Sequence, residues 1–151
     1  MNINTDFEIF PYSGASLLSF GMKIQDVENL IGPPDNISKN HLNQRVEFRS
    51  FMNVGYTAQD PASLNHIGFG RQMIGVRYGN IMLFKENENT VLKKLYDEDS
   101  QAFIYLGFVI FINLGITLTG FHDEDINQKA VTVFPHGIWD RRISKLKPFS
   151  F

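Results

Sequence analysis

The chain has 151 residues, of which 43% are hydrophobic, 20% charged and 13% aromatic, a profile that excludes disordered, collagen-like and coiled-coil proteins. It contains no cysteine, which excludes a disulfide scaffold, a cysteine nucleophile, a thiolate zinc site and an iron–sulfur cluster. The net charge of −2 argues against a general nucleic-acid binder, whose surface is usually basic. We expect a single globular domain over residues 1–151, because no linker-like stretch divides the chain.

The first third of the chain predicts a short strand followed by a short helix. Phe7 and Ile9 alternate as in a strand, which turn residues at 11–14 bring to an end. Gly32 is placed as a helix-ending glycine, and the two prolines after it forbid continuation. The apolar stripe of this helix, which we expect to pack on a sheet, consists of Ile24, Val27, Leu30 and Ile31.

A strand with one solvated side is expected at residues 45–51. Val46 and Phe48 alternate with charged residues, which predicts that these two apolar side chains face the core. The solvated side would then carry Arg45, Glu47 and Arg49. A polar loop is expected at residues 53–64.

The second half predicts several strands around one further helix. Asn87–Asn89 can cap this helix, whose apolar stripe consists of Val91, Leu92, Leu95 and Tyr96. Strand-like runs occur near residues 67–69, 74–78, 81–84, 102–105, 108–113, 116–121 and 130–134. A basic tail follows at residues 141–151.

Residues 102–121 contain no formal charge and are long enough to span a bilayer as a helix. Leu114, Ile116 and Leu118 nevertheless alternate with glycine and threonine, which is the period of a strand. Acidic residues flank the segment on both sides, without the basic residues that orient membrane helices. We therefore expect buried strands and no membrane association. Because the N-terminus resembles no signal peptide, we expect a cytoplasmic protein.

The fold class that these elements predict is α+β, with two short helices packed on a curved antiparallel sheet. The order of elements, helix then strands and again helix then strands, allows a tandem repeat of helix-then-meander units. The two halves share no clear sequence identity, so both a repeat and a single continuous arrangement remain open.

No pattern in the sequence predicts catalysis, a cofactor or a metal site, and we expect a protein that is not an enzyme. The segment His122-Asp123-Glu124-Asp125 contains metal-ligating residue types, but adjacent residues on an extended chain point to opposite sides. The glycines Gly68, Gly70 and Gly75 lack the spacing of a dinucleotide-binding loop and are interpreted as bends of a meander.

Two charged segments are the candidate partner-binding surfaces. One is the acidic loop Asp123, Glu124 and Asp125, and the other is the basic tail with Trp139, Arg141 and Arg142. Aromatic and arginine residues often dominate the binding energy of protein interfaces. The acidic loop is the preferred candidate if the partner is a nuclease with a basic cleft. Either segment can also be merely solvated.

The stretch from Gly21 to Pro34, Gly-Met-Lys-Ile-Gln-Asp-Val-Glu-Asn-Leu-Ile-Gly-Pro-Pro, resembles the first helix of small outer-membrane lipoproteins of the SmpA/OmlA type and of β-lactamase-inhibitor-protein-like proteins. It is also similar to small bacterial proteins regarded as immunity proteins against polymorphic toxins, as are residues 78–84 and 114–118. The resemblance implies helices on an antiparallel sheet and carries over no functional residue. The chain lacks the lipobox cysteine, which argues against an envelope role.

We therefore expect a non-catalytic binding protein, an immunity protein that neutralises a bacterial toxin by occluding it. The alternative is a small enzyme or a small-ligand carrier with an aromatic-lined pocket between helix and sheet. The oligomeric state is left open by the sequence.

Overall fold

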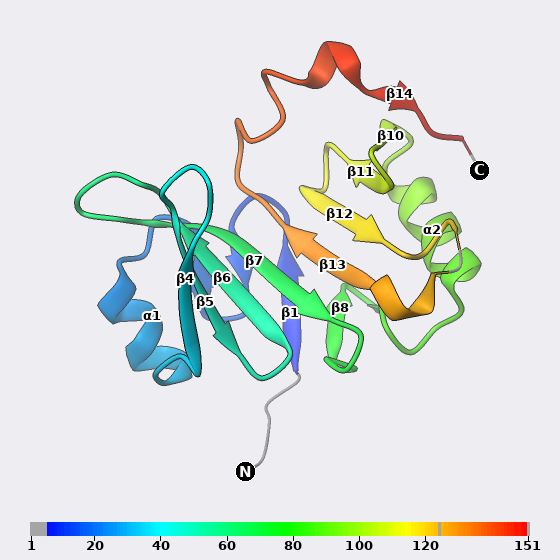
Figure 1. The fold of residues 1–151 in the computed structure, drawn as a ribbon. Helices are drawn as coiled ribbons and strands as arrows, with labels where there is room; N and C mark the ends of the chain where they lie inside the picture. Colours follow the sequence, from blue (N-terminus) through cyan, green and yellow to red (C-terminus); the bar gives the residue numbers. More distant parts are fainter. Residues whose placement is uncertain (1–5, 124, 151) are drawn as a thin grey trace.

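The computed structural model describes residues 6–123 and 125–150, which form two sheets and two α-helices (Figure 1). The larger sheet has nine antiparallel strands in the order β14-β10-β11-β12-β13-β7-β6-β5-β4. Their bounds are β4 Asn36–Lys39, β5 Arg45–Arg49, β6 Met52–Tyr56, β7 Leu64–Gly70, β10 Ala102–Tyr105, β11 Phe108–Phe111, β12 Ile116–Thr119, β13 Ala130–Val133 and β14 Lys147–Pro148.

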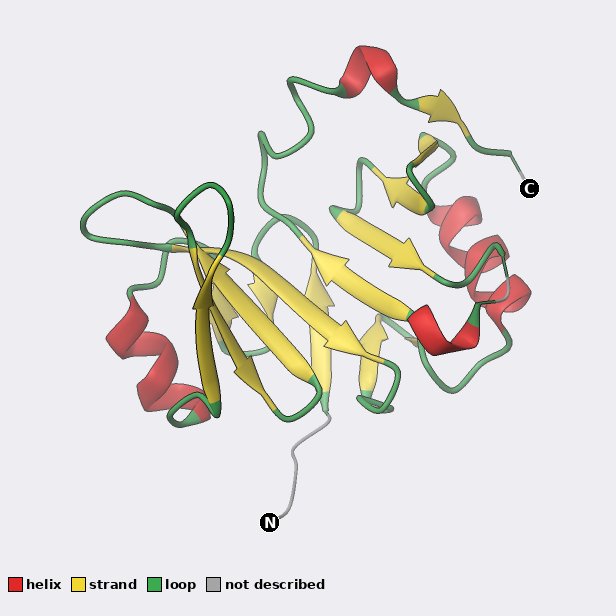
Figure 2. Cartoon of the chain, viewed as in Figure 1, coloured by secondary structure: helices red, strands yellow, loops and turns green. Residues whose placement is uncertain are grey.

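The smaller sheet has five short strands in the order β3-β2-β1-β8-β9, and its central pair β1 and β8 is parallel. Their bounds are β1 Phe7–Phe10, β2 Gly14–Ala15, β3 Leu18–Ser19, β8 Val76–Tyr78 and β9 Ile81–Met82. Figure 2 shows helix α1 (Ile24–Ile31) and helix α2 (Glu88–Glu98) at opposite ends of the molecule. Two 3-10 turns lie on either side of β13: η1 (Ile126–Gln128) before it, and η2 (Ile143–Lys145) between it and β14.

Both helices begin or end where the sequence predicts. The Asn87 side chain accepts a hydrogen bond from the Asn89 backbone N–H at 3.0 Å, which caps α2. The Gly32 N–H donates to the Glu28 carbonyl at 2.8 Å and ends α1, with a positive φ of 84° that favours glycine. Each helix buries an apolar stripe in the common core, through Val27 in α1 and residues 91, 92 and 95 in α2.

The chain passes twice through the same order of elements: a short hairpin, a helix and a four-stranded meander. The first pass is β2-β3, α1 and β4 to β7, and the second is β8-β9, α2 and β10 to β13. The last strands of the two meanders, β7 and β13, pair antiparallel and join them into one sheet. The expected α+β fold, with two short helices on an antiparallel sheet, is confirmed. The tandem order of elements, which the sequence left open, is present in the structure.

The strand registers define two faces of the large sheet. The inner face packs on the helices and the small sheet, and one row across it from β5 to β10 is fully buried: Glu47, Val54, Ile67, Val133, Ile116, Phe111 and Ala102. The neighbouring row lies on the opposite side, which we call the outer face: Phe48, Asn53, Gly68, Thr132, Thr117, Ile110 and Phe103.

Strand β5 is oriented opposite to the prediction from its alternation. Glu47 and Arg49 lie on the inner face, with Glu47 only 1% exposed, whereas Phe48 is 42% exposed on the outer face. The charged residues can be buried because they pair with each other and with Tyr56, as described below. An alternating pattern identifies two sides of a strand, but the partners on each side decide which one is buried.

Three other expectations from the sequence are wrong in part. Residues 53–64 are not a single loop, because β6 and the start of β7 occupy much of that range, and β4 was not anticipated. Leu30 is 43% exposed and therefore lies at the edge of the α1 stripe. Gly68 and Gly70 lie within β7 and not at bends.

Residues 102–121 form β10, β11 and β12, as expected. Within the described part of the chain, neither helix has the length and the apolar character needed to cross a membrane.

Candidate functional site

The two halves of the outer face differ in what covers them. Over β10 to β12, the chain's own C-terminal segment, residues 134–149, packs on the sheet and buries Ile110 together with Phe134 and Leu146. Figure 1 shows this segment, in orange and red, passing around the β10–β12 end of the sheet. Over β5 to β7, Phe48 and Phe51 stay 42% and 43% exposed. The outer face of the first meander is therefore the bare half.

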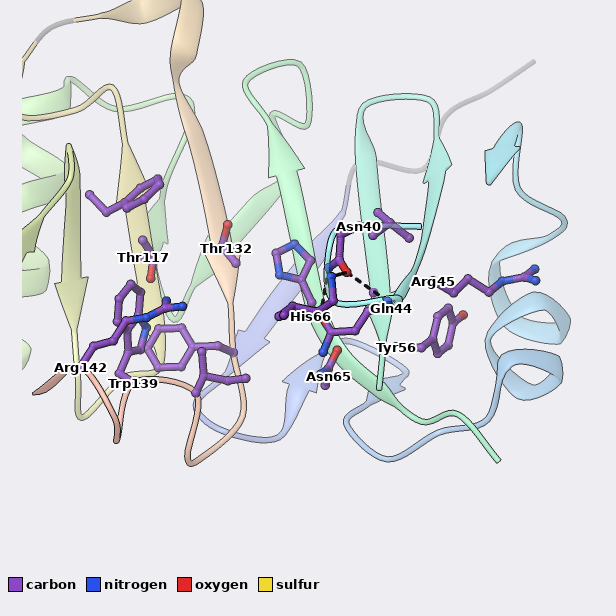
Figure 3. A pocket seen from close by; sticks show the side chains of 16 residues that line it. Asn40, Gln44, Arg45, Tyr56, Asn65, His66, Thr117, Thr132, Trp139 and Arg142 are labelled. Carbon is purple, nitrogen blue, oxygen red and sulfur yellow. Dashed lines mark hydrogen bonds between the residues drawn. The ribbon is translucent and has the colours of Figure 1, made fainter. Parts of the chain in front are cut away.

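A cavity of about 400 Å³ lies at the border between the covered and the bare halves. One wall is the loop between β4 and β5, with Asn40, Leu42 and Gln44, and the opposite wall is the C-terminal segment. Figure 3 shows His66 and Thr132 on the strands between these two walls. A second hollow of about 200 Å³ lies farther along the outer face, beside Phe48 and Phe51.

Two glycines on the outer face make room for neighbouring side chains of the sheet. Gly55 lies opposite His66 in the sheet, and a Cβ at Gly55 would lie 3.1 Å from the His66 Cβ. A Cβ at Gly68 would lie 2.9 Å from the Asn53 side-chain nitrogen. These two glycines therefore leave the space that the Asn53 and His66 side chains occupy.

His66 is held in place on the outer face as a neutral ring. Its Nε2 lies 2.9 Å from the Asn53 Oδ1, so this nitrogen carries the proton and donates it to the amide oxygen. Burial lowers the pKa of His66 below its ordinary value, because the charged form loses solvation. No carboxylate lies among the residues that line the cavity, so nothing there favours an imidazolium.

The C-terminal wall is built around Trp139, the one tryptophan of the sequence. Its ring meets Tyr105 and Phe134 edge to face, with centroids 6.0 and 6.2 Å apart. The Arg142 guanidinium lies 5.7 Å from the Trp139 ring centroid, within the range of a cation–π contact. The indole Nε1 is buried and donates no hydrogen bond. Beside the tryptophan, the wall thus holds the exposed Arg142 cation and a buried indole donor without an acceptor.

On the opposite side of the sheet, an ion cluster fixes β5 to the rest of the core. Glu47 accepts hydrogen bonds from Arg45 Nε at 2.8 Å, from Arg49 Nη1 at 2.8 Å and from the Tyr56 hydroxyl at 3.0 Å. Burial acts to raise the pKa of Glu47, but these hydrogen bonds outweigh it and lower the pKa. Burial and the Glu47 charge raise the pKa of Tyr56. Figure 3 shows that Arg45 points away from His66, toward α1.

Basic residues are concentrated in the two walls of the cavity. Residues 36–46 and 138–147 together contain six of the 14 lysines and arginines but one of the 16 acidic residues, a net charge of +5 in a chain whose total is −2. Arg45 shares the Glu47 carboxylate with Arg49, and the exposed positive charge comes mainly from the C-terminal wall. Arg141, Arg142, Lys145 and Lys147 are all exposed there.

The structure separates the two charged segments that the sequence singled out. Trp139 and Arg142 line the cavity, and Arg141 is exposed next to them. Asp123 and Asp125 are exposed in the loop before β13, whereas the C-terminal wall follows the other end of that strand. Glu124 lies outside the described residues.

Sequence reasoning missed the outer-face residues Phe48, Phe51 and His66. A signal for this face was present in the Gly-Phe-Gly of residues 68–70, where glycine alternates with a buried aromatic residue as on the two sides of a strand. The cavity described above lies on the outer face, away from both helices.

The lining of the cavity offers aromatic, amide and basic side chains to whatever enters it. Among residues 6–123 and 125–150, there is no group of three or more histidine, aspartate or glutamate side chains that could hold a metal ion. His66, the histidine in the cavity, bonds through Nε2 to the Asn53 amide oxygen at 2.9 Å. Comparisons with protein-family models, with curated proteins and with solved structures found no significant match to this chain.

Proposed function

We propose that this chain is a non-catalytic binding protein, an immunity protein that occludes a bacterial toxin with the bare half of its outer face. The observation that carries the proposal is the unequal cover of two equivalent meanders. The second meander buries its outer face under the C-terminal segment, and the first leaves two phenylalanines at its surface.

Exposed aromatic residues are typical of protein interfaces. Phe48 and Phe51 supply large apolar area on the outer face of the first meander. Arg142 adds the residue type that, with tryptophan and tyrosine, is most enriched among residues that dominate binding energy. A protein that acts by occlusion needs such a surface and no reactive group.

Co-expression with the product of each neighbouring gene tests the proposal. The wild-type chain should rescue growth from a toxic neighbour and form a complex with it, and the Phe48→Ala, Phe51→Ala double variant should lose both effects. Phe10→Ala is the matched control, because Phe10 is 44% exposed but lies on β1 of the small sheet. Equal rescue by the double variant would remove the bare half from the interface, and no binding to any neighbour would refute the immunity role.

The cavity supports a second candidate, a carrier of a small molecule. Its volume of about 400 Å³ falls within the usual range of small-ligand sites, and its lining mixes aromatic and amide side chains. Native mass spectrometry of the purified protein distinguishes the two functions. A stoichiometric co-purifying small molecule, lost in Trp139→Ala, would favour the carrier.

A further inference from the structure

We infer that the cavity between residues 40–46 and 138–142 accepts a carboxylate side chain of the protein partner, held beside Arg142 and Trp139. This inference rests on the proposed function, since it assigns the chemistry of the partner's contact surface. It favours a partner with an acidic contact loop over a nuclease with a basic cleft.

The charge of the cavity selects the sign of the group that enters it. Arg142 is the one charged side chain of the lining without an ion pair among the described residues, because Arg45 binds Glu47 and burial lowers the pKa of His66. Asp140, the single acidic residue of the two walls, does not line this cavity. An entering lysine or arginine would therefore meet a like charge and no carboxylate, whereas an entering acidic side chain would meet its counter-ion.

The hydrogen-bonding groups around the cavity point to the same chemistry. The Arg142 guanidinium is exposed and makes no hydrogen bond to a described residue, so it is a donor that an incoming oxygen can satisfy. The Trp139 indole N–H is buried beside it without an acceptor, so its environment changes with what binds at Arg142. The Asn40 side-chain N–H already donates a hydrogen bond to the Gln44 Oε1 at 2.9 Å. A carboxylate offers two acceptor oxygens and matches a guanidinium in a two-bond geometry.

The size and the lining of the cavity favour a side chain over a bare anion. About 400 Å³ is far more than a single small ion fills, and Phe108, Phe134 and Ile138 make much of the wall apolar. A glutamate or aspartate on a partner loop matches both features of the cavity. Its methylene groups and backbone can pack against the apolar walls, and its carboxylate can bind Arg142. The exposed basic residues around Arg142 would also steer an acidic partner toward this end of the sheet.

The experiment follows the indole N–H of Trp139, which gives a single indole signal in the ¹H–¹⁵N spectrum because the chain has one tryptophan. The wild-type protein is titrated with the acetylated and amidated peptide Gly-Leu-Glu-Leu-Gly, with its glutamine and lysine counterparts, and with inorganic phosphate. The glutamate peptide should shift the signal until it saturates, and its affinity should fall at high salt. The other two peptides and phosphate should bind at least about tenfold more weakly.

Matched variants assign the effect to the cavity. Arg142→Gln should lower the affinity for the glutamate peptide about tenfold. Arg71→Gln removes an exposed arginine just beyond the C-terminal end of β7 and should leave this affinity unchanged. Equal shifts by all three peptides, tighter binding of phosphate than of the glutamate peptide, no shift at all, or an unchanged affinity in Arg142→Gln would each overturn the inference.

These outcomes are independent of the test of the proposed function. If the glutamate peptide binds as expected but no neighbouring gene product does, the cavity chemistry holds and the immunity role fails. If a neighbour binds through Phe48 and Phe51 but the peptide series shows no preference for glutamate, the partner docks on the bare half without an acidic side chain in the cavity.

Discussion

Replacing Glu47 with glutamine tests whether the buried ion cluster on the inner face holds β5 to the core. Glu47 is 1% exposed and accepts three hydrogen bonds, two of them from arginines. Arg49, whose side chain is 9% exposed, also donates from Nε to the Gly32 carbonyl at the end of α1 at 2.9 Å. The substitution keeps the size of the side chain but leaves the buried Arg49 without a counter-charge.

The expected loss in the free energy of unfolding is about 3–5 kcal/mol, the usual cost of removing one partner from a buried ion pair. Arg49 cannot recover this loss from solvent, because its Nη2 is already buried without a hydrogen bond. Typical domains have roughly 5–15 kcal/mol of stability in total, so the variant should unfold at a much lower denaturant concentration. Arg45→Gln is the control and should cost about 1 kcal/mol or less, since the Arg45 side chain is 32% exposed.

Urea unfolding followed by Trp139 fluorescence and by circular dichroism measures both variants. The double variant Glu47→Leu, Arg49→Met removes both charges and should recover most of the stability that Glu47→Gln loses, because an apolar pair avoids the desolvation penalty. A cost below about 1 kcal/mol for Glu47→Gln, equal to that of Arg45→Gln, would mean that the cluster is solvated and that β5 is not oriented as described.

Three further predictions concern the helices, the pH response and the outer face. Leu95→Ala in α2 should cost about 2–5 kcal/mol and Leu30→Ala in α1 about 1 kcal/mol, because Leu95 is fully buried and Leu30 is 43% exposed; equal costs would contradict this placement. Burial lowers the folded-state pKa of His66, so the unfolded chain takes up a proton first and stability should fall as the pH drops through the ordinary histidine value of 6.5. His66→Gln should remove this dependence of the free energy of unfolding on pH, as measured from denaturation curves recorded on either side of pH 6.5. Gly68→Ala should destabilise the fold by about 1–3 kcal/mol, because its Cβ displaces the Asn53 side chain, and the same change in an Asn53→Ala background should cost clearly less.

Local patterns in the sequence determined most of the elements. The cap of α2, the glycine that ends α1 and the period-two alternation of residues 116–119 each depend on a few neighbouring residues, and each is found where expected. Such features follow from backbone geometry, which neighbouring residues control directly. The order of elements allowed a helix-then-meander repeat but did not decide it.

The tertiary structure alone decided which side of β5 is buried and where the cavity lies. The alternation of β5 fits either orientation, and the buried one depends on Tyr56 and on the Gly32 carbonyl, which come from β6 and from the end of α1. The cavity joins residues 40–46 to residues 138–142, segments about a hundred positions apart that meet because β7 pairs with β13. Charge pairing and burial are properties of contacts between distant segments, and a periodicity along one strand carries no information about them.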